Sequence, residues 1–169
     1  PVPHLLAGLP FTAHMTAHIL VVAVAAPLVA WGLAETRLDP VRLGPATLLS
    51  PIPASMVELV AVWAWHAPAL HEAARLSTAA FLAEQATFLA AGLLLWAAIL
   101  GGRPEARAAR HLAGTAALVF TSIHMTLLGA LFALAPRAFY AHEDGHAGAQ
   151  PLFDLQLGGA VMLVVGGAA

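Results

Sequence analysis

Residues 78–100 read TAAFLAEQATFLAAGLLLWAAIL, and Glu84 is the only charged residue among them. A helix of about 20 apolar residues is long enough to cross the hydrocarbon core of a lipid bilayer. This stretch therefore predicts a membrane-spanning helix with one acidic side chain inside it. Because a charge facing lipid is costly, we expect Glu84 to face other helices.

Four more apolar stretches flank this one, and turn residues such as Gly101-Gly102 separate them. We predict an all-α fold, a polytopic transmembrane helix bundle of about five spans that forms a single domain over residues 1–169. The predicted helices cover residues 11–34, 54–70, 78–100, 112–135 and 152–169.

The composition agrees with a membrane protein, since 60% of the 169 residues are hydrophobic and only 9% are charged. Soluble domains average roughly 25% charged residues. The few arginines lie in separate loops, so the chain lacks the clustered basic face of a nucleic-acid-binding protein. Cysteine is absent, which excludes disulfides and thiolate metal sites.

Arginine counts in the loops predict the orientation. The first and third loops carry two and three arginines, five in total, and the second and fourth carry one each. Because positive loops stay in the cytoplasm, we expect the N-terminus outside and a multi-pass protein of the bacterial inner membrane.

Histidines recur in the apolar stretches. His14 and His18 are four residues apart and would share one helix face. In the predicted topology, His66 and His124 lie in the periplasmic half of the membrane with them. We predict these four histidines as ligands of one metal ion. Alternatively, the His14–His18 pair could cap a helix or form hydrogen bonds across helices, and His66 could simply lie at the membrane interface.

Four other side chains, which are polar or contain sulfur, lie at similar predicted depths. We predict that they bind the metal ion or form hydrogen bonds with the residues that bind it. The alternatives are packing for the methionines, hydrogen bonding with Gln85 and a neighbouring helix for Glu84, and capping of the fifth helix for Asp154. Imidazoles with a thioether and a carboxylate suit copper, whereas histidines alone also suit zinc or haem iron. The four candidates are Met15, Glu84, Met125 and Asp154.

Five segments, in this order and spacing, resemble the multi-spanning CtaG-type cytochrome c oxidase assembly factors. They are HMTAHILVVAVAAPLVAWG, VWAWHAPALHEAA, FLAEQATFLAAGLLLW, HMTLLGALFALAPRAFY and PLFDLQLGGAVMLVVGG. The chain departs from the family at Gln85, where relatives commonly have histidine, and at Leu155, where they have glutamine.

The resemblance implies a role in assembling a haem-copper terminal oxidase through copper handling. The expected partners are an oxidase subunit or another respiratory membrane protein and the lipid bilayer, and the chain could form an oligomer. We expect no enzymatic activity, because no nucleophile elbow, phosphate-binding loop or His-Glu-x-x-His pattern occurs.

Three alternatives remain open at this point. Histidines on different helices could bind haem b. Intramembrane His, Glu and Asp could relay protons or metal ions, although the predicted cytoplasmic halves are nearly apolar, with Glu58 the main exception. The chain could also be a structural subunit of a larger respiratory membrane complex, packed through its many small residues.

Overall fold

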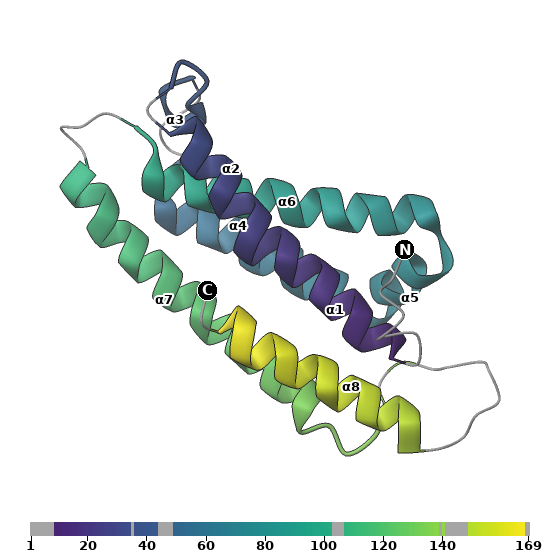
Figure 1. Cartoon of the computed structure of the whole chain (residues 1–169). Coiled ribbons are helices and arrows are strands. Elements are labelled where there is room, and N and C mark those ends of the chain that lie inside the picture. Colours follow the sequence, from purple (N-terminus) through teal and green to yellow (C-terminus); the bar gives the residue numbers. More distant parts are fainter. Residues whose placement is uncertain are drawn as a thin grey trace. The chain divides into compact units, whose positions relative to one another are not determined.

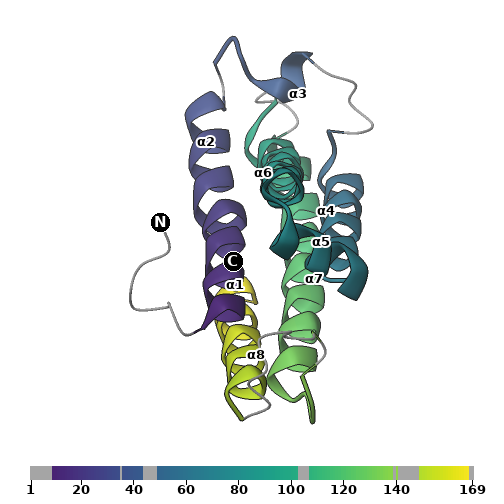
Figure 2. The same ribbon diagram turned by 90° about the vertical axis from the view of Figure 1, so that its right-hand side faces the viewer.

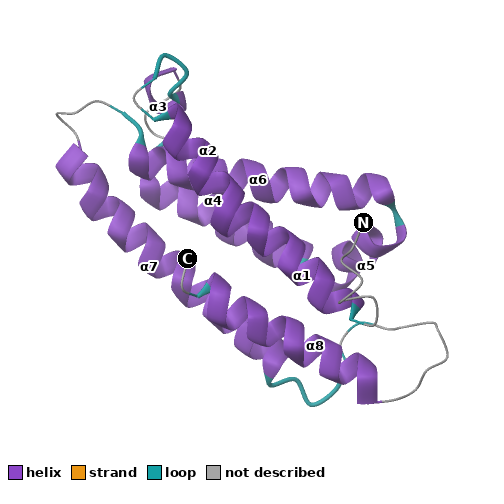
Figure 3. Ribbon diagram, in the orientation of Figure 1, coloured by secondary structure: helices purple, strands orange, loops and turns teal. Residues whose placement is uncertain are grey.

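A computed structural model describes residues 9–34, 36–43, 49–102, 107–138, 140 and 149–167. Within these ranges the chain forms helices joined by loops, without a strand (Figure 3). The predicted all-α fold class is therefore confirmed.

The helices follow one another along the chain as labelled in Figure 1. They are α1 (Pro10–Leu20), η2 (Val21–Ala25), α2 (Ala26–Leu33), α3 (Pro40–Leu43), α4 (Pro51–Trp65), α5 (Pro68–Leu76), α6 (Thr78–Leu100), α7 (Arg107–Ala133), α8 (Ala149–Val161) and η4 (Met162–Gly166).

The chain divides into two compact units, which we describe separately. The central unit is Leu20–Thr121, and the terminal unit combines Pro1–Ile19 with Ser122–Ala169.

Three helices are long and apolar enough to cross a membrane, namely Pro10–Leu33, Thr78–Leu100 and Ala108–Ala133. Two shorter apolar helices, Pro51–Trp65 and Pro151–Gly166, fall at the other two predicted spans. The apolar helices indicate a membrane protein, while a count of five spans stays a prediction.

The predicted helix over residues 54–70 is wrong at its end. α4 stops at Trp65, and a new helix, α5, begins at Pro68 after a break at His66 and Ala67. Ala67 has φ −64° and ψ 138°, the extended conformation that a following proline favours. The break places the residues after Pro68 on a separate helix.

The first long helix contains one wide turn, η2. The backbone N–H of Ala26 donates to the carbonyl of Val21, five residues earlier. Pro27 follows directly and has no N–H to donate, and such interruptions of the regular ladder accompany wide turns. The helix nevertheless continues to Leu33.

The central unit is built around α6, which packs against α2, α4 and α5. Figure 2 shows α6 between α2 and α4. A Cβ atom at Gly92 would lie 2.8 Å from the Cβ of Ala26, so the glycine permits the close approach of α6 and α2. Small side chains recur in the core, which contains Ala54, Leu95, Ala98, Ile99 and Ala117.

Glu58 and Thr121 form a buried polar pair in the central unit. The Thr121 hydroxyl donates to Oε2 of Glu58 at 2.6 Å. Thr121→Val should lower the free energy of unfolding by about 1–3 kcal/mol, because the carboxyl group loses this bond in an apolar surrounding. Thermal unfolding in detergent measures the change. Thr121→Ser keeps the hydroxyl and should lose less, and an equal loss in both variants would contradict the explanation.

The terminal unit depends on close contacts of α7 with α8 and η4. A Cβ atom at Gly159 would overlap the backbone nitrogen of Ala133, and one at Gly129 would overlap the backbone nitrogen of Leu163. Without side chains at these two positions, the helix backbones can touch.

Three aromatic rings pack together at one end of the terminal unit. The ring centroid of Phe11 lies 5.5 Å from that of Phe132 and 5.4 Å from that of Tyr140. Burial in this apolar surrounding raises the pKa of Tyr140. The Tyr140 side chain is therefore a neutral phenol that packs the start of α1 against the segment after α7.

Candidate metal centre

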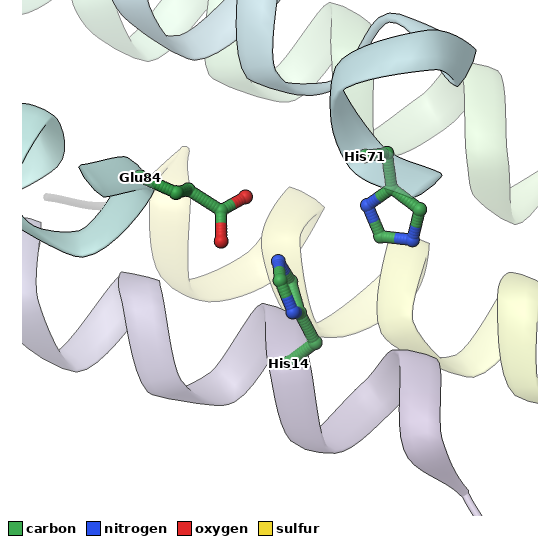
Figure 4. A group of neighbouring side chains, drawn as sticks. All are labelled: His14, His71 and Glu84. Atoms are coloured by element: carbon green, nitrogen blue, oxygen red, sulfur yellow. The ribbon is translucent and has the colours of Figure 1, made fainter. Parts of the chain in front are cut away.

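The central unit brings a buried histidine and a buried carboxylate together. His71 on α5 is 3% exposed, and Glu84 on α6 is 1% exposed. A ring nitrogen of His71 and a carboxylate oxygen of Glu84 lie within 4.8 Å of each other, a separation that one metal ion can bridge (Figure 4). We call this pair the His71–Glu84 cluster.

The short connection between α5 and α6 positions the cluster. α5 ends at Leu76, and α6 begins at Thr78 with Ser77 as its N-cap, whose hydroxyl accepts the backbone N–H of Ala80 at 3.4 Å. α5 then packs back against α6. The buried face of α5 contains His71 and Ala74, so the imidazole is on the packed side of the helix.

Gln85 constrains the Glu84 carboxylate. The Gln85 side-chain amide donates to Oε2 of Glu84 at 3.2 Å. This bond confirms the predicted alternative for Glu84, a hydrogen bond with its neighbour, and it orients the carboxylate. A neutral imidazole and a carboxylate together suit a divalent ion such as Cu(II) or Zn(II).

His14 and His18 lie on α1, in the terminal unit. Their ring centroids lie 5.7 Å apart at an interplanar angle of 73°, as expected for residues four apart on one helix face. His18 is buried and His14 is partly exposed.

His66 is the C-cap residue of α4, in the central unit. Its Nδ1 lies 2.6 Å from the carbonyl oxygen of Val62. A carbonyl only accepts, so Nδ1 carries the proton and Nε2 carries the lone pair. The imidazole lies near Phe88, at 6.2 Å between ring centroids. His66 could thus offer Nε2 to a metal, but among the described residues it is outside the His71–Glu84 cluster.

His124 is buried in the half of α7 that belongs to the terminal unit. Neither His124 nor His18 is part of the cluster in the portion of the chain that the structure describes. Ligation by these two histidines stays a prediction.

The two candidate methionines pack against glycines of the C-terminal helices. A Cβ atom at Gly158 would lie 3.2 Å from Cγ of Met15, and one at Gly166 would lie 3.0 Å from Cε of Met125. Both methionines are buried. These contacts support the packing alternative for both thioethers.

A family model of the cytochrome c oxidase caa3 assembly factor (Caa3_CtaG) matches residues 2–169. The chain belongs to this family. The match confirms the resemblance drawn from the five segments, and it identifies the family's role as assembly of cytochrome c oxidase. Neither a curated protein nor a solved structure matches the chain significantly.

Asp154 of this family member does not cap its own helix. α8 begins at Ala149, which places Asp154 beyond the first turn, so the predicted alternative of a cap on the fifth helix is wrong. Its carboxylate instead accepts the backbone N–H groups of Phe11 at 2.8 Å and Thr12 at 2.9 Å, in the first turn of α1.

Gln156 makes a comparable bond on the other side of α8. Its side-chain amide donates to the carbonyl of Ala135, just after α7, at 3.1 Å. The Asp154-Leu155-Gln156 segment of this family member thus joins α8 to the beginning of α1 and to the end of α7.

His71 was not among the site residues predicted from the sequence. The wrong end of the predicted helix over residues 54–70 left His71 in a loop. An amphipathic pattern was the available signal, because His71 and Ala74 are buried while Glu72 and Arg75 form a more exposed ion pair at 3.1 Å.

Proposed function

We propose that this member of the caa3 assembly-factor family handles copper for a haem-copper oxidase at a site that includes the His71–Glu84 cluster. Two protein ligands are fewer than a bound ion normally takes. We propose that the histidines predicted from the sequence supply further ligands, and His14 is one candidate. His18, His66 and His124 are the other candidates.

The observation that carries the proposal is the burial of both His71 and Glu84 within ligand distance of each other. Burying an imidazole beside a carboxylate in an apolar helix bundle is costly unless the groups are paired or bind an ion. Because an ion held by few protein ligands keeps exchangeable positions, such a site suits transfer to a client better than permanent storage.

We further propose the topology that this role needs. The three long helices together with Pro51–Trp65 and Pro151–Gly166 would make five spans in the bacterial inner membrane, with the N-terminus outside. The excess of arginines in the first and third loops supports this orientation. The copper-receiving partner would then be an oxidase subunit that is open to the periplasm.

Copper binding by the purified full-length chain tests the site. We expect His71→Ala and Glu84→Gln each to weaken Cu(II) binding by at least about 10-fold, because each variant removes a candidate ligand. Equilibrium titration followed by electron paramagnetic resonance (EPR) measures the affinity and the ligand set. His111→Ala is the matched control, since His111 is an exposed histidine on α7 and should leave binding unchanged.

The same variants should be compared in cells whose own copy of the protein has been deleted. Loss of oxidase maturation with His71→Ala, but not with His111→Ala, would support copper handling. Wild-type copper affinity in both cluster variants would overturn the proposed site. A Soret band in the freshly purified protein would instead favour the haem b alternative.

A further inference from the structure

Asp154 supplies the N-terminal cap of a helix that lies far from it in the sequence. Oδ2 accepts the N–H of Phe11 at 2.8 Å, and Oδ1 accepts the N–H of Thr12 at 2.9 Å. The Thr12 hydroxyl also donates to Oδ1, at 2.7 Å. Asp154 is 2% exposed, so these bonds form in a dry surrounding.

Among the described residues, the one that precedes α1 has no side chain that could cap it. Leu9 precedes the helix and accepts the first backbone bond, from Ala13 at 2.9 Å, but its aliphatic side chain cannot accept an N–H. Pro10 follows and has no N–H at all. The next two amides, of Phe11 and Thr12, are the ones that Asp154 accepts. The acceptor of these two amides thus comes from α8.

This cap fixes the rotation of α1 as well as its beginning. Two carboxylate oxygens hold two successive amides, which leaves the first turn little freedom to rotate about the helix axis. One turn beyond Asp154 on α8, Gly158 lies against Met15. Since each residue turns the helix by about 100°, fixing Phe11, Thr12 and Met15 also fixes the direction of His14 and His18.

We propose that Asp154 is a positioning residue that sets the orientation of the ligand histidines His14 and His18 through the first turn of α1. The inference rests on the proposed function, because it assigns these histidines to the copper site. Asp154 itself would not touch the metal, since its two oxygens are already bonded to α1.

Asp154→Asn tests this role in the full-length chain. The amide keeps one acceptor oxygen, but its NH₂ group would face a backbone N–H, so half of the cap is lost. We expect Cu(II) affinity to fall by roughly 10-fold, as it does when groups that orient ligands are changed, together with altered EPR hyperfine parameters. Thr12→Val removes only the hydroxyl bond and should give a smaller change in the same direction.

Gln156→Leu is the matched control, because it breaks one bond of α8 to the end of α7 and leaves α1 capped. It should lower thermal stability without changing the copper spectrum. Similar spectral changes in Asp154→Asn and Gln156→Leu would overturn the positioning role, as would an unchanged spectrum in Asp154→Asn. Absence of copper from the wild-type protein would overturn the proposed function and, with it, this role.

Discussion

Gly159→Ala is expected to lower the free energy of unfolding by at least about 1–3 kcal/mol, the usual cost of overpacking a close contact. A Cβ atom at this position would overlap the backbone nitrogen of Ala133 and approach the Cβ of Phe132 to 2.7 Å. A backbone atom cannot rotate away as a flexible side chain can. α8 would therefore have to move away from α7, and other close contacts in the terminal unit would loosen.

Gly32→Ala is the matched control for this prediction. Gly32 is also on a helix, but a Cβ atom there would meet nothing within 4 Å. The added methyl group should be neutral or stabilising by up to about 1 kcal/mol, because alanine favours helix more than glycine does. Thermal unfolding of the three proteins in one detergent compares them. Equal stability of Gly159→Ala and Gly32→Ala would show that α7 and α8 do not pack as closely as described.

Asp39→Ala is expected to lower the free energy of unfolding by about 2–6 kcal/mol. The substitution leaves two buried N–H donors without their acceptor, at about 1–3 kcal/mol each. Asp39 is fully buried in the central unit. Its Oδ1 accepts the N–H of Val41 at 2.9 Å, and its Oδ2 accepts the N–H of Gly102 at 2.8 Å. Gly102 has φ +97°, a conformation that favours glycine, so the bond also holds an uncommon backbone geometry.

Arg42→Gln separates this hydrogen bonding from the adjacent ion pair. The Arg42 guanidinium lies 3.4 Å from Oδ2 of Asp39, but its side chain is 37% exposed. Pairs of this kind contribute at most about 1 kcal/mol. Denaturant titration should therefore show a much smaller loss for Arg42→Gln than for Asp39→Ala. A comparable loss in both would assign the effect to the charge pair.

Hydropathy predicted the helices well where proline did not intervene. The helix predicted over residues 78–100 has the observed limits of α6, and the first predicted helix differs from Pro10–Leu33 by one residue at each end. The prediction failed at Pro68, because an apolar average over residues 54–70 ignores the backbone restriction before proline. The helix predicted over residues 112–135 also begins too late, because the first turns of α7, which starts at Arg107, carry arginines.

The candidate site was less predictable, because it depends on which helix faces meet. Glu84 was found as the only charge in an apolar stretch, and its hydrogen bond with Gln85 was foreseen as an alternative. His71 was missed, since its burial results from α5 folding back on α6. The backbone N–H groups that donate to the Asp154 carboxylate lie 143 and 142 residues away in the sequence, a separation that no local pattern encodes.

That separation has a consequence for synthesis of the chain. Phe11 and Thr12 leave the ribosome long before Asp154 is translated, so their N–H groups must find temporary acceptors, such as water or lipid headgroups. The first turn of α1 can take its final form only after α8 has been made and has packed against it. α1 is thus completed by a residue made about 140 positions later, so its first turn lacks its final acceptor while the intervening residues are translated.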